Sequence, residues 1–555
     1  MLWPAVAVAV AGGLYGCNGD HDHDDHAEQD SGNTVDKAVA NIDNVVVIFA
    51  ENRSFDNLYS EFPGQQDPLA TATFEKQKDR DGKTELATLP PVWNGLTQPA
   101  ASQFVAGLPT VTQADTEGMP NAPFSINEDY GVGLNAVTHD MWHQFYQNQM
   151  QINGGKNDMF VAWADAGGMV MGHFSGAEEQ SLPLWNVAKK YTLADRFFQG
   201  AFGGSFLNHQ YLIASAPLTV DPALAKYATS IAVLTDGDQG HQLEIAAARA
   251  GESALTAGAG GLFTRDGPVT PDGFAINTMQ PAYQPSSVAP AADATGDALL
   301  LADPNAGNVV TPQTGPNIGD YLTQKNVDWA WYSGGWDYIL GRTTPPNAYV
   351  GNDGGGVNPV TGVANANFQF HHQPFNYFAR FDPATPEGAA ERAAHLKDAG
   401  LEGERFVADI DAGKLPPVSF YKPVGNLNEH NGYADVLRGD QKIADIIAHL
   451  EKSPQWEHML VVVTYDENGG IWDHIAPPKA DRFGPGSRIP ALIIGPTVKK
   501  NNVDHAVNDT TSILRFITRR WSLPVLPGLK NRNDGYKANG VTPGDLTEAL
   551  EASAS

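Results

Sequence analysis

Two short runs of β-branched residues dominate the hydrophobic pattern of the chain. Residues 44–50 read NVVVIFA and residues 459–465 read MLVVVTY, with few polar residues inside either run. A strand with one solvent-facing side alternates apolar and polar residues, whereas a strand covered on both faces is almost continuously apolar. The pattern therefore predicts two strands of a parallel sheet with helices on each side. A third run, IPALII at 489–494, ends at Gly495-Pro496 and predicts another strand.

Amphipathic segments between these runs predict helices. Residues 439–442 lead into IADIIAHLEKS, where apolar residues recur at spacings of three and four. Pro183 precedes LWNVAKKY and is typical of the first turn of a helix. Asn508-Asp509 precedes the amphipathic segment TTSILRFITRRW as a helix cap. Alternating strands and helices predict an α/β fold around a mainly parallel sheet.

Two long stretches interrupt this alternation. Residues 62–130 and 215–320 are rich in Ala, Gly, Pro and Asp and contain few long apolar runs. We interpret both as large insertions that form lobes over the carboxyl edge of one sheet, within a single catalytic domain at 41–545. Separate domains are the alternative interpretation.

The first forty residues have the composition of an export signal and a linker. Residues 1–17, MLWPAVAVAVAGGLYGC, carry no charge and resemble the apolar region of a secretory signal. Their end, LYGC, resembles a bacterial lipobox, although the first basic residue of the chain is Lys37. Residues 18–40 are acidic and His-rich at their start and are expected to be a solvated linker. We expect an exported protein that is either periplasmic, with or without an anchor to the membrane through a lipid on Cys17, or secreted.

Charge restricts the partners of the protein. The 555 residues include 35 Lys and Arg against 64 Asp and Glu, which gives a formal net charge of −29. A strongly acidic protein repels the nucleic-acid backbone, so nucleic acid is not expected as a specific ligand. An anionic substrate would need local positive charge, from a metal ion or from histidines.

Both valine-rich strands end in polar residues that suit a metal ion. Glu51 and Asn52 follow the first strand, and Asp466 and Glu467 follow the second. The carboxyl ends of parallel strands meet at one edge of a sheet, where ligands bind in α/β proteins. Carboxylate and amide oxygens are ligands for a hard cation such as Mg²⁺, Ca²⁺ or Mn²⁺. Each pair alone is typical of an ordinary strand-to-loop junction; the two together favour a site.

Ser205 is the candidate nucleophile. It lies in QGAFGGSFLNHQ, where three glycines precede the serine and a helix is expected to follow. Glycines allow a substrate to approach the backbone, and amides at a helix N-terminus favour an anion. The alternative is a flexible turn in which Ser205 only caps the helix.

Four histidines lie in aromatic or Asn-rich sequence and are candidates to neutralise a phosphate or protonate a leaving group. They are His139, His371, His372 and His430. Two others, His143 and His173, are assigned to packing or surface positions. The roles of His209 and His474 are left open, although His474 in GGIWDHIAPP is placed to steady the predicted metal loop.

Several of these segments resemble one protein family. ENRSFDNLY, THDMWHQ, FGGSFLNHQ, NEHNGYAD, YDENGGIWDHIAPP and GPGSRIPALIIGP occur in that order between about residue 41 and about residue 525. They resemble the bacterial phosphoesterase family of acid phosphatases and phospholipases C, within the alkaline-phosphatase-like superfamily. The resemblance implies an α/β fold, an alkaline-phosphatase-like three-layer sandwich around a mainly parallel sheet.

The resemblance also implies a set of roles for the candidate residues. One divalent metal ion (Ca, Mg, Mn or Zn) is expected on Glu51, Asn52, Ser205, Asp466 and Glu467. Ser205 is expected to be phosphorylated during turnover, with His430 and His139 catalytic. Asn52, His371 and His372 are expected to bind the substrate. Some relatives carry Asp where this chain has Glu467, so the longer side chain places the identity of the metal, or direct ligation by Glu467, in question.

The nucleophile segment suggests a branch within the family. Gly-Gly-Ser-Phe-Leu-Asn-His at 203–209 is closer to the acid phosphatases than to phospholipases C, which tend to carry Thr in a Pro-Asn-containing loop. The expected function is a metal-dependent acid phosphatase that hydrolyses phosphomonoesters through a phosphoserine. Two alternatives remain: a phospholipase C-type phosphodiesterase acting through the same site, and an exported lipoprotein that binds a metal or an anion without turnover.

Overall fold

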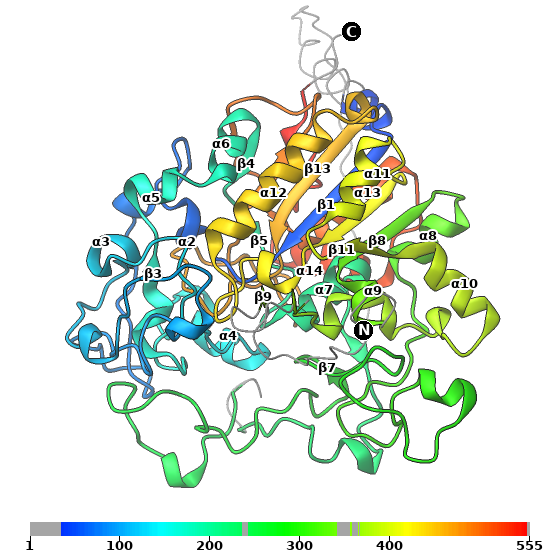
Figure 1. The fold of residues 1–555 in the computed structure, drawn as a ribbon. Coiled ribbons are helices and arrows are strands. Elements are labelled where there is room, and N and C mark those ends of the chain that lie inside the picture. The colour runs from blue at the N-terminus through cyan, green and yellow to red at the C-terminus, as the bar shows by residue number, and fades with distance from the viewer. Residues whose placement is uncertain (1–34, 236–241, 341–355, 358–363, 366, 552–555) are drawn as a thin grey trace, which may run out of the picture.

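The computed structural model describes residues 35–235, 242–340, 356–357, 364–365 and 367–551. The proposed signal at 1–17, with Cys17, and most of the predicted linker lie outside these residues. An eight-stranded sheet forms the centre of the fold (Figure 1). From one edge to the other, its strands are β11 (Leu396–Gly400), β8 (Trp329–Gly334), β12 (Val418–Lys422), β1 (Asn44–Ala50), β13 (Met459–Tyr465), β14 (Ala491–Ile494), β4 (Thr192–Ala194) and β15 (Asn502–Asp504).

The two valine-rich runs are adjacent central strands. β1 pairs in parallel with β13 along its whole length and with β12 on its other side, and every residue of β1 and β13 is buried. This confirms the prediction from the hydrophobic pattern. The third predicted strand is shorter than expected and begins at Ala491, since Pro490 has no amide hydrogen to donate to a ladder. β14 is also antiparallel to both of its neighbours, so the sheet is mainly but not wholly parallel.

Side chains of β12 and β8 show that helices cover both faces of the sheet. Successive residues of a strand point to opposite faces. Tyr421 stacks on Phe406 of α11 (Glu404–Asp411) with ring centroids 4.6 Å apart. Phe420 packs instead against Trp331, which lies 6.1 Å from His209 of α7 (Ser205–Ala214). The fold is therefore the predicted sandwich, with the sheet between two helical layers.

Helices of each layer pack on one another. α6 (Pro183–Lys190) and α12 (Val436–Leu450) lie with α11, and α12 crosses in front of β1 and β13 in Figure 1. On the other face, α7 packs against α8 (Ile318–Gln324) and α13 (Thr510–Arg520). The predicted starts of α6 and α13 are confirmed.

Helix α12 begins earlier than the sequence analysis expected. Asp435 caps it by accepting a 2.9 Å hydrogen bond from the amide of Arg438, so Gly439 lies inside the first turns rather than before them. A Cβ at Gly439 would lie only 2.4 Å from Cγ of Glu429. The glycine is thus explained by close packing and not by a helix start.

The remaining elements lie between these strands and helices and in the C-terminal part of the chain. The helices are α2 (Phe55–Tyr59), α3 (Ile126–Tyr130), α4 (Phe145–Ile152), α5 (Gly176–Gln180), α9 (Trp336–Ile339), α10 (Pro386–His395) and α14 (Pro527–Ala538). Two-residue strands pair as β2 (Phe124–Ser125) with β3 (Gly172–His173), β5 (Phe197–Phe198) with β16 (Asn508–Asp509), β6 (Leu218–Thr219) with β7 (Phe274–Ala275), and β9 (Gly356–Val357) with β10 (Ala364–Asn365).

The two proposed insertions contain little regular structure. Within the described residues of 62–130 and 215–320, helices and strands are at most a few residues long. The green 215–320 segment runs along the lower edge of Figure 1, beyond the carboxyl ends of β1 and β13. This position agrees with a lobe over that edge of the sheet. The division into one domain with two insertions stays a prediction.

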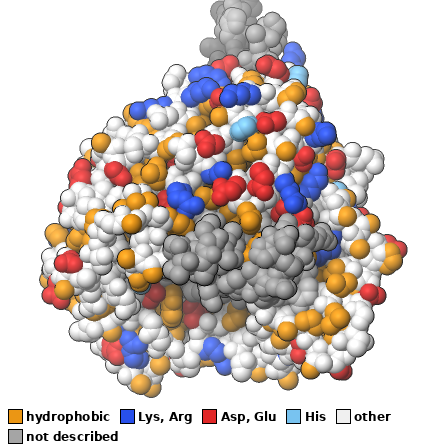
Figure 2. Space-filling model, in the orientation of Figure 1, with side chains coloured by type: hydrophobic (Ala, Val, Ile, Leu, Met, Phe, Trp, Pro, Cys, Tyr) orange, Lys and Arg blue, Asp and Glu red, His pale blue; other side chains and the backbone are white. Residues whose placement is uncertain are grey.

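Acidic and basic side chains are mixed on one face of the protein surface. Figure 2 shows acidic and basic side chains interspersed over the helix-covered face, with apolar side chains scattered between them. The surplus of acidic charge therefore does not collect in one patch on this face. Within the described ranges, no helix combines the length and apolar character that crossing a bilayer requires.

Glu179 of α5 is a buried carboxyl group that makes folding depend on pH. Its Oε1 accepts 3.3 Å hydrogen bonds from the Ser60 hydroxyl and the Glu61 amide, and its Oε2 has no hydrogen-bond partner among the described residues. Burial raises the pKa of this group from 4.5 to about 9. The folded protein therefore holds a proton that the unfolded chain releases, and stability falls as the pH rises between these two values.

We expect Glu179→Gln to raise the melting temperature at about pH 8 and to leave it unchanged at about pH 4, because the amide is neutral at both. The gain at the higher pH should be on the order of 2 kcal/mol. Thermal unfolding of both proteins across this range measures it. An equal change at both pH values would show that packing, not ionisation, is responsible.

Candidate active site

A cavity of about 280 Å³ lies where the loops after the central strands meet. Five of the residues singled out from the sequence line it: Glu51, Ser205, His371, His372 and His430. Asn277 and Thr278 of the 215–320 segment also line it, so this segment reaches the site. Asn52, Asp466 and Glu467 are fully buried beside Glu51. Residues far apart in the chain are thus brought to one place.

Ser205 is the first residue of α7 and points at Glu51. Its hydroxyl donates a 2.8 Å hydrogen bond to Oε2 of Glu51. Gly204 precedes the helix without a side chain, so the first amides of this ten-residue helix are not capped by a side chain. A helix N-terminus of this kind favours an anion, and an anion bound there would lie next to the serine hydroxyl.

The glycines before Ser205 have a packing role. A Cβ at Gly203 would lie 2.5 Å from the amide nitrogen of Phe145, and one at Gly204 would lie 2.8 Å from the carbonyl oxygen of His143. The sequence analysis assigned these glycines to the approach of a substrate. The structure shows that they also let residues 143–145 approach the nucleophile loop.

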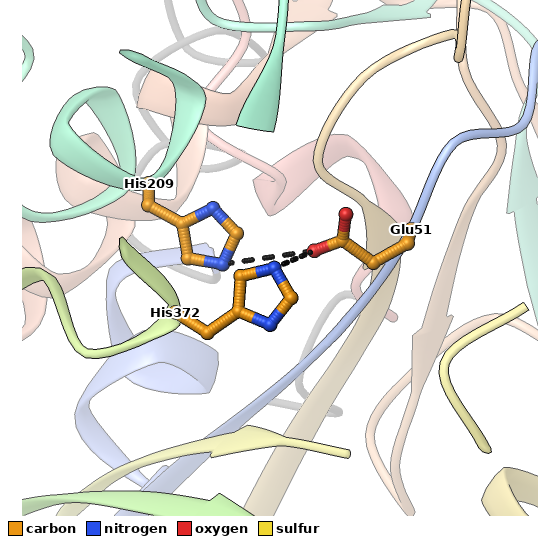
Figure 3. A group of neighbouring side chains, drawn as sticks. All are labelled: Glu51, His209 and His372. Carbon is orange, nitrogen blue, oxygen red and sulfur yellow. Dashed lines mark ion pairs between the residues drawn. The ribbon is translucent and has the colours of Figure 1, made fainter. Parts of the chain in front are cut away.

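Glu51 presents its two oxygens to different neighbours. Oε2 accepts from Ser205, whereas Oε1 accepts from the ammonium group of Lys422. His372 and His209 direct their Nε2 atoms at the same Oε1, at 3.0 Å and 3.9 Å (Figure 3). Burial would raise the pKa of Glu51, but the charge of Lys422 and the contact with His372 outweigh it and hold the pKa well below its usual value. Glu51 is therefore a carboxylate.

The side chain of Asp466 forms hydrogen bonds with the backbone at the ends of both central strands. Its Oδ1 accepts a 3.1 Å hydrogen bond from the amide of Asn52 and a 2.8 Å bond from the amide of Glu467. Its Oδ2 has no hydrogen-bond partner among the described residues. Burial and the neighbouring charge of Glu51 raise the pKa of Asp466 well above its usual value, and burial and Asp466 do the same for Glu467. A divalent cation would favour the ionised form of both.

The backbone turns where the ligand prediction required it to turn. Asn52 has a φ of 60°, and Gly469 and Gly470 have φ values of 63° and 75°. These left-handed conformations end both strands abruptly. Adjacent side chains of each pair can therefore face one point, although they would point apart in an extended strand.

The amide of Asn52 provides a test of the metal site. With its nitrogen toward the carboxylates, it donates 3.0 Å hydrogen bonds to Oε1 of Glu467 and Oε2 of Glu51, and its oxygen lies 2.9 Å from Nε2 of His430. In the opposite orientation the amide oxygen of Asn52 faces Oε1 of Glu467 and Oε2 of Glu51, and a cation between these three oxygens would stabilise the arrangement. The donor set of carboxylates, an amide and the Ser205 hydroxyl fits one divalent ion, as the resemblance implies.

The buried histidines favour their neutral forms. Burial is the main cause that lowers the pKa of His371, His372 and His430, for His372 to about 4. The sequence analysis considered these rings as imidazolium groups. Burial thus disfavours the protonated forms in the ligand-free protein, and the negative charge of a bound anion would favour them.

The structure gives different positions to the two histidines of THDMWHQ. His139 is not among the residues that line the cavity, whereas His143, assigned to a structural role, lines it. Nε2 of His143 lies 3.5 Å from Oε1 of Glu467, and its ring is 5.7 Å from that of His430. Because the two histidines are only four residues apart, the sequence offered no basis for the distinction.

Lys422 was not among the predicted site residues, and the role of His209 was left open. His209 follows Ser205 by one helical turn on the same face of α7, and its Nδ1 lies 2.7 Å from the carbonyl oxygen of Ser205. That spacing of four residues was a usable signal. Lys422 ends β12, two residues after Phe420, so it emerges on the face that carries α7. The short run VSFYK was not identified as a strand.

His474 belongs to a separate buried network. Its Nδ1 lies 2.6 Å from Oδ2 of Asp56, and Arg488 bonds Asp56 at 2.8 Å and Asp473 at 2.9 Å. Although burial lowers the pKa of His474, Asp56 outweighs it and raises the pKa. The network joins the loop after β13 to α2, and the role of His474 beside the proposed metal loop stays a prediction.

A second layer of contacts joins three site loops. Arg53, Glu429 and Tyr465 are the immediate neighbours of Asn52, His430 and Asp466. Nε of Arg53 donates a 3.0 Å hydrogen bond to the carbonyl oxygen of Glu429, and the hydroxyl of Tyr465 donates a 2.8 Å bond to Oε2 of Glu429. Glu429 has a φ of 76°, which is strained for a residue with a side chain. The three-residue network therefore holds an unfavourable backbone conformation next to His430.

We expect Tyr465→Phe to lower kcat by about tenfold, because Glu429 loses the partner of its buried Oε2 and the loop carrying His430 loosens. Stability should fall by about 1–3 kcal/mol. Steady-state kinetics and thermal unfolding measure both. Tyr332→Phe is the matched control: Tyr332 lies in β8 of the same sheet, and the change removes the 2.8 Å hydrogen bond from its hydroxyl to Asp409 of α11. An equal loss of kcat in the control would reject the positioning role.

Comparison with known proteins identifies the family. The Phosphoesterase family model matches residues 42–524. Phospholipase C B of Mycobacterium tuberculosis is 31% identical over 174 residues, 27% of this chain and 32% of the relative. Non-hemolytic phospholipase C of Burkholderia pseudomallei is 25% identical over 297 residues, 38% of this chain and 41% of the relative. These matched segments thus span less than half of each relative.

Among solved structures, phosphonate monoester hydrolase SpPMH from Silicibacter pomeroyi matches with 14% identity and a TM-score of 0.27, over 66% of this chain and 73% of that chain. The family match extends over most of the chain and includes every residue of the cavity described here. The chain belongs to the Phosphoesterase family.

Proposed function

We propose that this protein is a metal-dependent phosphatase that hydrolyses phosphomonoesters through a phosphoserine at Ser205. The observation that carries the proposal is the position of this hydroxyl. It lies at a helix N-terminus in a histidine-lined cavity, 2.8 Å from a carboxylate of the proposed metal site. A protein that only bound an anion would have no need of a nucleophile at this point.

The proposed metal ligands are the oxygens of Glu51, Asn52, Ser205, Asp466 and Glu467. A divalent ion bound there would lower the pKa of the serine hydroxyl and offset charge on the phosphoryl oxygens. Glu51 orients the hydroxyl rather than removing its proton, since the pKa of Glu51 is already held low by Lys422. Glu51, Asn52, Asp466 and Glu467 are fully buried, whereas Ser205 is 6% exposed and lines the cavity.

The reaction is a double displacement. Ser205 Oγ forms a bond to phosphorus, its proton passes to solvent, and the bond between phosphorus and the leaving oxygen breaks. An anionic substrate raises the pKa of the nearby imidazoles, so His430 gains a proton and donates it to the leaving oxygen. Water then attacks the phosphoserine, His430 takes up a proton of that water, and Ser205 Oγ leaves and regains a proton from solvent. His371, His372 and Asn52 bind the terminal oxygens, and His143 is added to this group because it lines the cavity.

Two features support a monoester as the substrate. Several nitrogen-bearing side chains face the cavity, which suits the three terminal oxygens of a phosphomonoester. The volume of about 280 Å³ suits a compact group rather than a lipid. The segment around Ser205 also resembles the acid phosphatase branch.

A phospholipase C-type diesterase is the second candidate. The curated relatives above are named phospholipases C, and Trp142, next to His143, is 38% exposed and offers apolar surface close to the cavity. A diester would use the same nucleophile and leave its lipid tails outside the cavity.

The test supplies purified protein with an aryl phosphomonoester or phosphatidylcholine vesicles, with added divalent ions, from mildly acidic to neutral pH. Serine-dependent phosphate release from the monoester that exceeds diacylglycerol release supports the phosphatase, and a maximum at acidic pH supports the acid phosphatase branch. Dominant diacylglycerol release would assign the diesterase. Metal binding without hydrolysis of either substrate would favour the exported binding protein.

A further inference from the structure

Glu51 has a second set of neighbours beyond the proposed metal site. On the side of Oε2 lie Ser205, Asn52 and the carboxylates of the proposed site. On the side of Oε1 lie His209, His372 and Lys422. One carboxylate thus faces the proposed metal site on one side and two imidazoles with an ammonium group on the other. A bridging carboxylate of this kind joins the two ions of binuclear hydrolases, which lie about 3.5–4 Å apart.

Glu51 and the two histidines on the side of its Oε1 form a complete set of zinc ligands. One ligand atom each from Glu51, His209 and His372 lies within 4.8 Å of the others, and all three residues are buried. Two imidazoles and one glutamate form the protein ligands of several catalytic zinc sites. The His209 and His372 rings are stacked with centroids 4.9 Å apart, so both present Nε2 to the same oxygen (Figure 3).

Lys422 already places a positive charge at this point. Its Nζ contacts Oε1 of Glu51, donates a 3.0 Å hydrogen bond to the carbonyl oxygen of Phe49 and lies 5.5 Å from the centroid of the Phe49 ring. The side chain is 1% exposed. Strand β12 fixes it there, because β12 pairs with β1 and Lys422 and Phe420 point to the same face.

We propose that the ammonium group of Lys422 occupies the position that a second metal ion would take, so that the protein binds one divalent ion. Removal of the Lys422 side chain then opens a zinc site on Glu51, His209 and His372. An ammonium group and a divalent ion cannot both lie against the same oxygen, since like charges at that distance repel strongly. The inference rests on the proposed metal site and concerns the number of ions, which activity alone does not report.

The experiment counts zinc. Metal-free protein is dialysed against excess Zn²⁺, and the bound ion is measured by elemental analysis for wild type, Lys422→Ala, and the double variant Lys422→Ala/His209→Ala. We expect one ion per chain in wild type, two in Lys422→Ala, and one again in the double variant. One ion in Lys422→Ala would overturn the inference.

If Lys422→Ala does not fold, His209→Ala and Asp466→Asn still test the number of bound ions. Wild type should bind one ion and His209→Ala the same number; two ions in wild type, with the second lost in His209→Ala, would overturn the inference. Asp466→Asn separates this result from the proposed function. Wild type without any ion would refute the proposed metal site itself, whereas one ion that Asp466→Asn abolishes, with no second ion in Lys422→Ala, would refute only the role of Lys422.

Discussion

Ser205→Ala is expected to lower phosphoester turnover by a factor on the order of 10⁴ or more, because the variant has no oxygen to form the bond to phosphorus. The hydroxyl makes one hydrogen bond within the described residues, to Glu51, so the fold should be retained. Stopped assays with an aryl phosphate measure the rate. Mass spectrometry of acid-quenched wild type should find phosphate on Ser205.

The matched control is Ser215→Ala, at the other end of the same helix. Ser215 has a φ of 52°, which alanine tolerates about as well, and its buried hydroxyl has no hydrogen-bond partner in the described part of the chain. Its rate should stay close to that of wild type. If Ser205→Ala retained more than about a tenth of the wild-type rate, another nucleophile would have to be sought.

Asp466→Asn is expected to remove the bound ion and lower turnover at least about 100-fold, since the site loses a charged oxygen ligand. The same change should not harm the metal-free fold. Burial raises the pKa of Asp466 above its value in the unfolded chain, so ionisation at neutral pH opposes folding, and the neutral amide removes that cost. Elemental analysis, kinetics and thermal unfolding of metal-free protein measure the three effects.

Asp440→Asn is the control for the effects of Asp466→Asn on metal content and on stability. Asp440 of α12 is also fully buried, with a pKa raised to about 8, but it accepts a 2.8 Å hydrogen bond from Leu184 and does not line the cavity. Its replacement should raise stability at neutral pH without changing the metal content. A loss of metal in both variants would point to a general effect of buried charge and not to ligation by Asp466.

The sequence was sufficient for the parts of the fold that a continuous apolar run specifies. β1 and β13 were predicted with correct boundaries because both are buried on two faces, and the polar residues at their ends follow from that assignment. β12 was missed because five residues with one lysine carry little pattern. The antiparallel direction of β14 was also missed, because direction depends on connections and not on composition.

Site residues were predictable where a motif marks the chemistry and not where packing selects among similar side chains. Ser205 and His430 lie in distinctive segments and line the cavity. Lys422 reaches Glu51 only because β12 is next to β1, which is a property of strand order. The ionisation state of the histidines was not predictable either, since it depends on how deeply the folded chain buries each ring.

The order of strands also has a consequence for how the chain is made. β1 lies near the start of the described chain, yet its partners are β12 and β13, at residues 418–421 and 459–465. During synthesis VVVIF therefore emerges long before anything can pair with it, and an unpaired apolar strand of this kind promotes aggregation. Contacts of such long range also form slowly. Truncated or prematurely released chains that lack β13 are thus expected to be insoluble as well as inactive, and full-length chains should depend on a chaperone until residues beyond 465 are available.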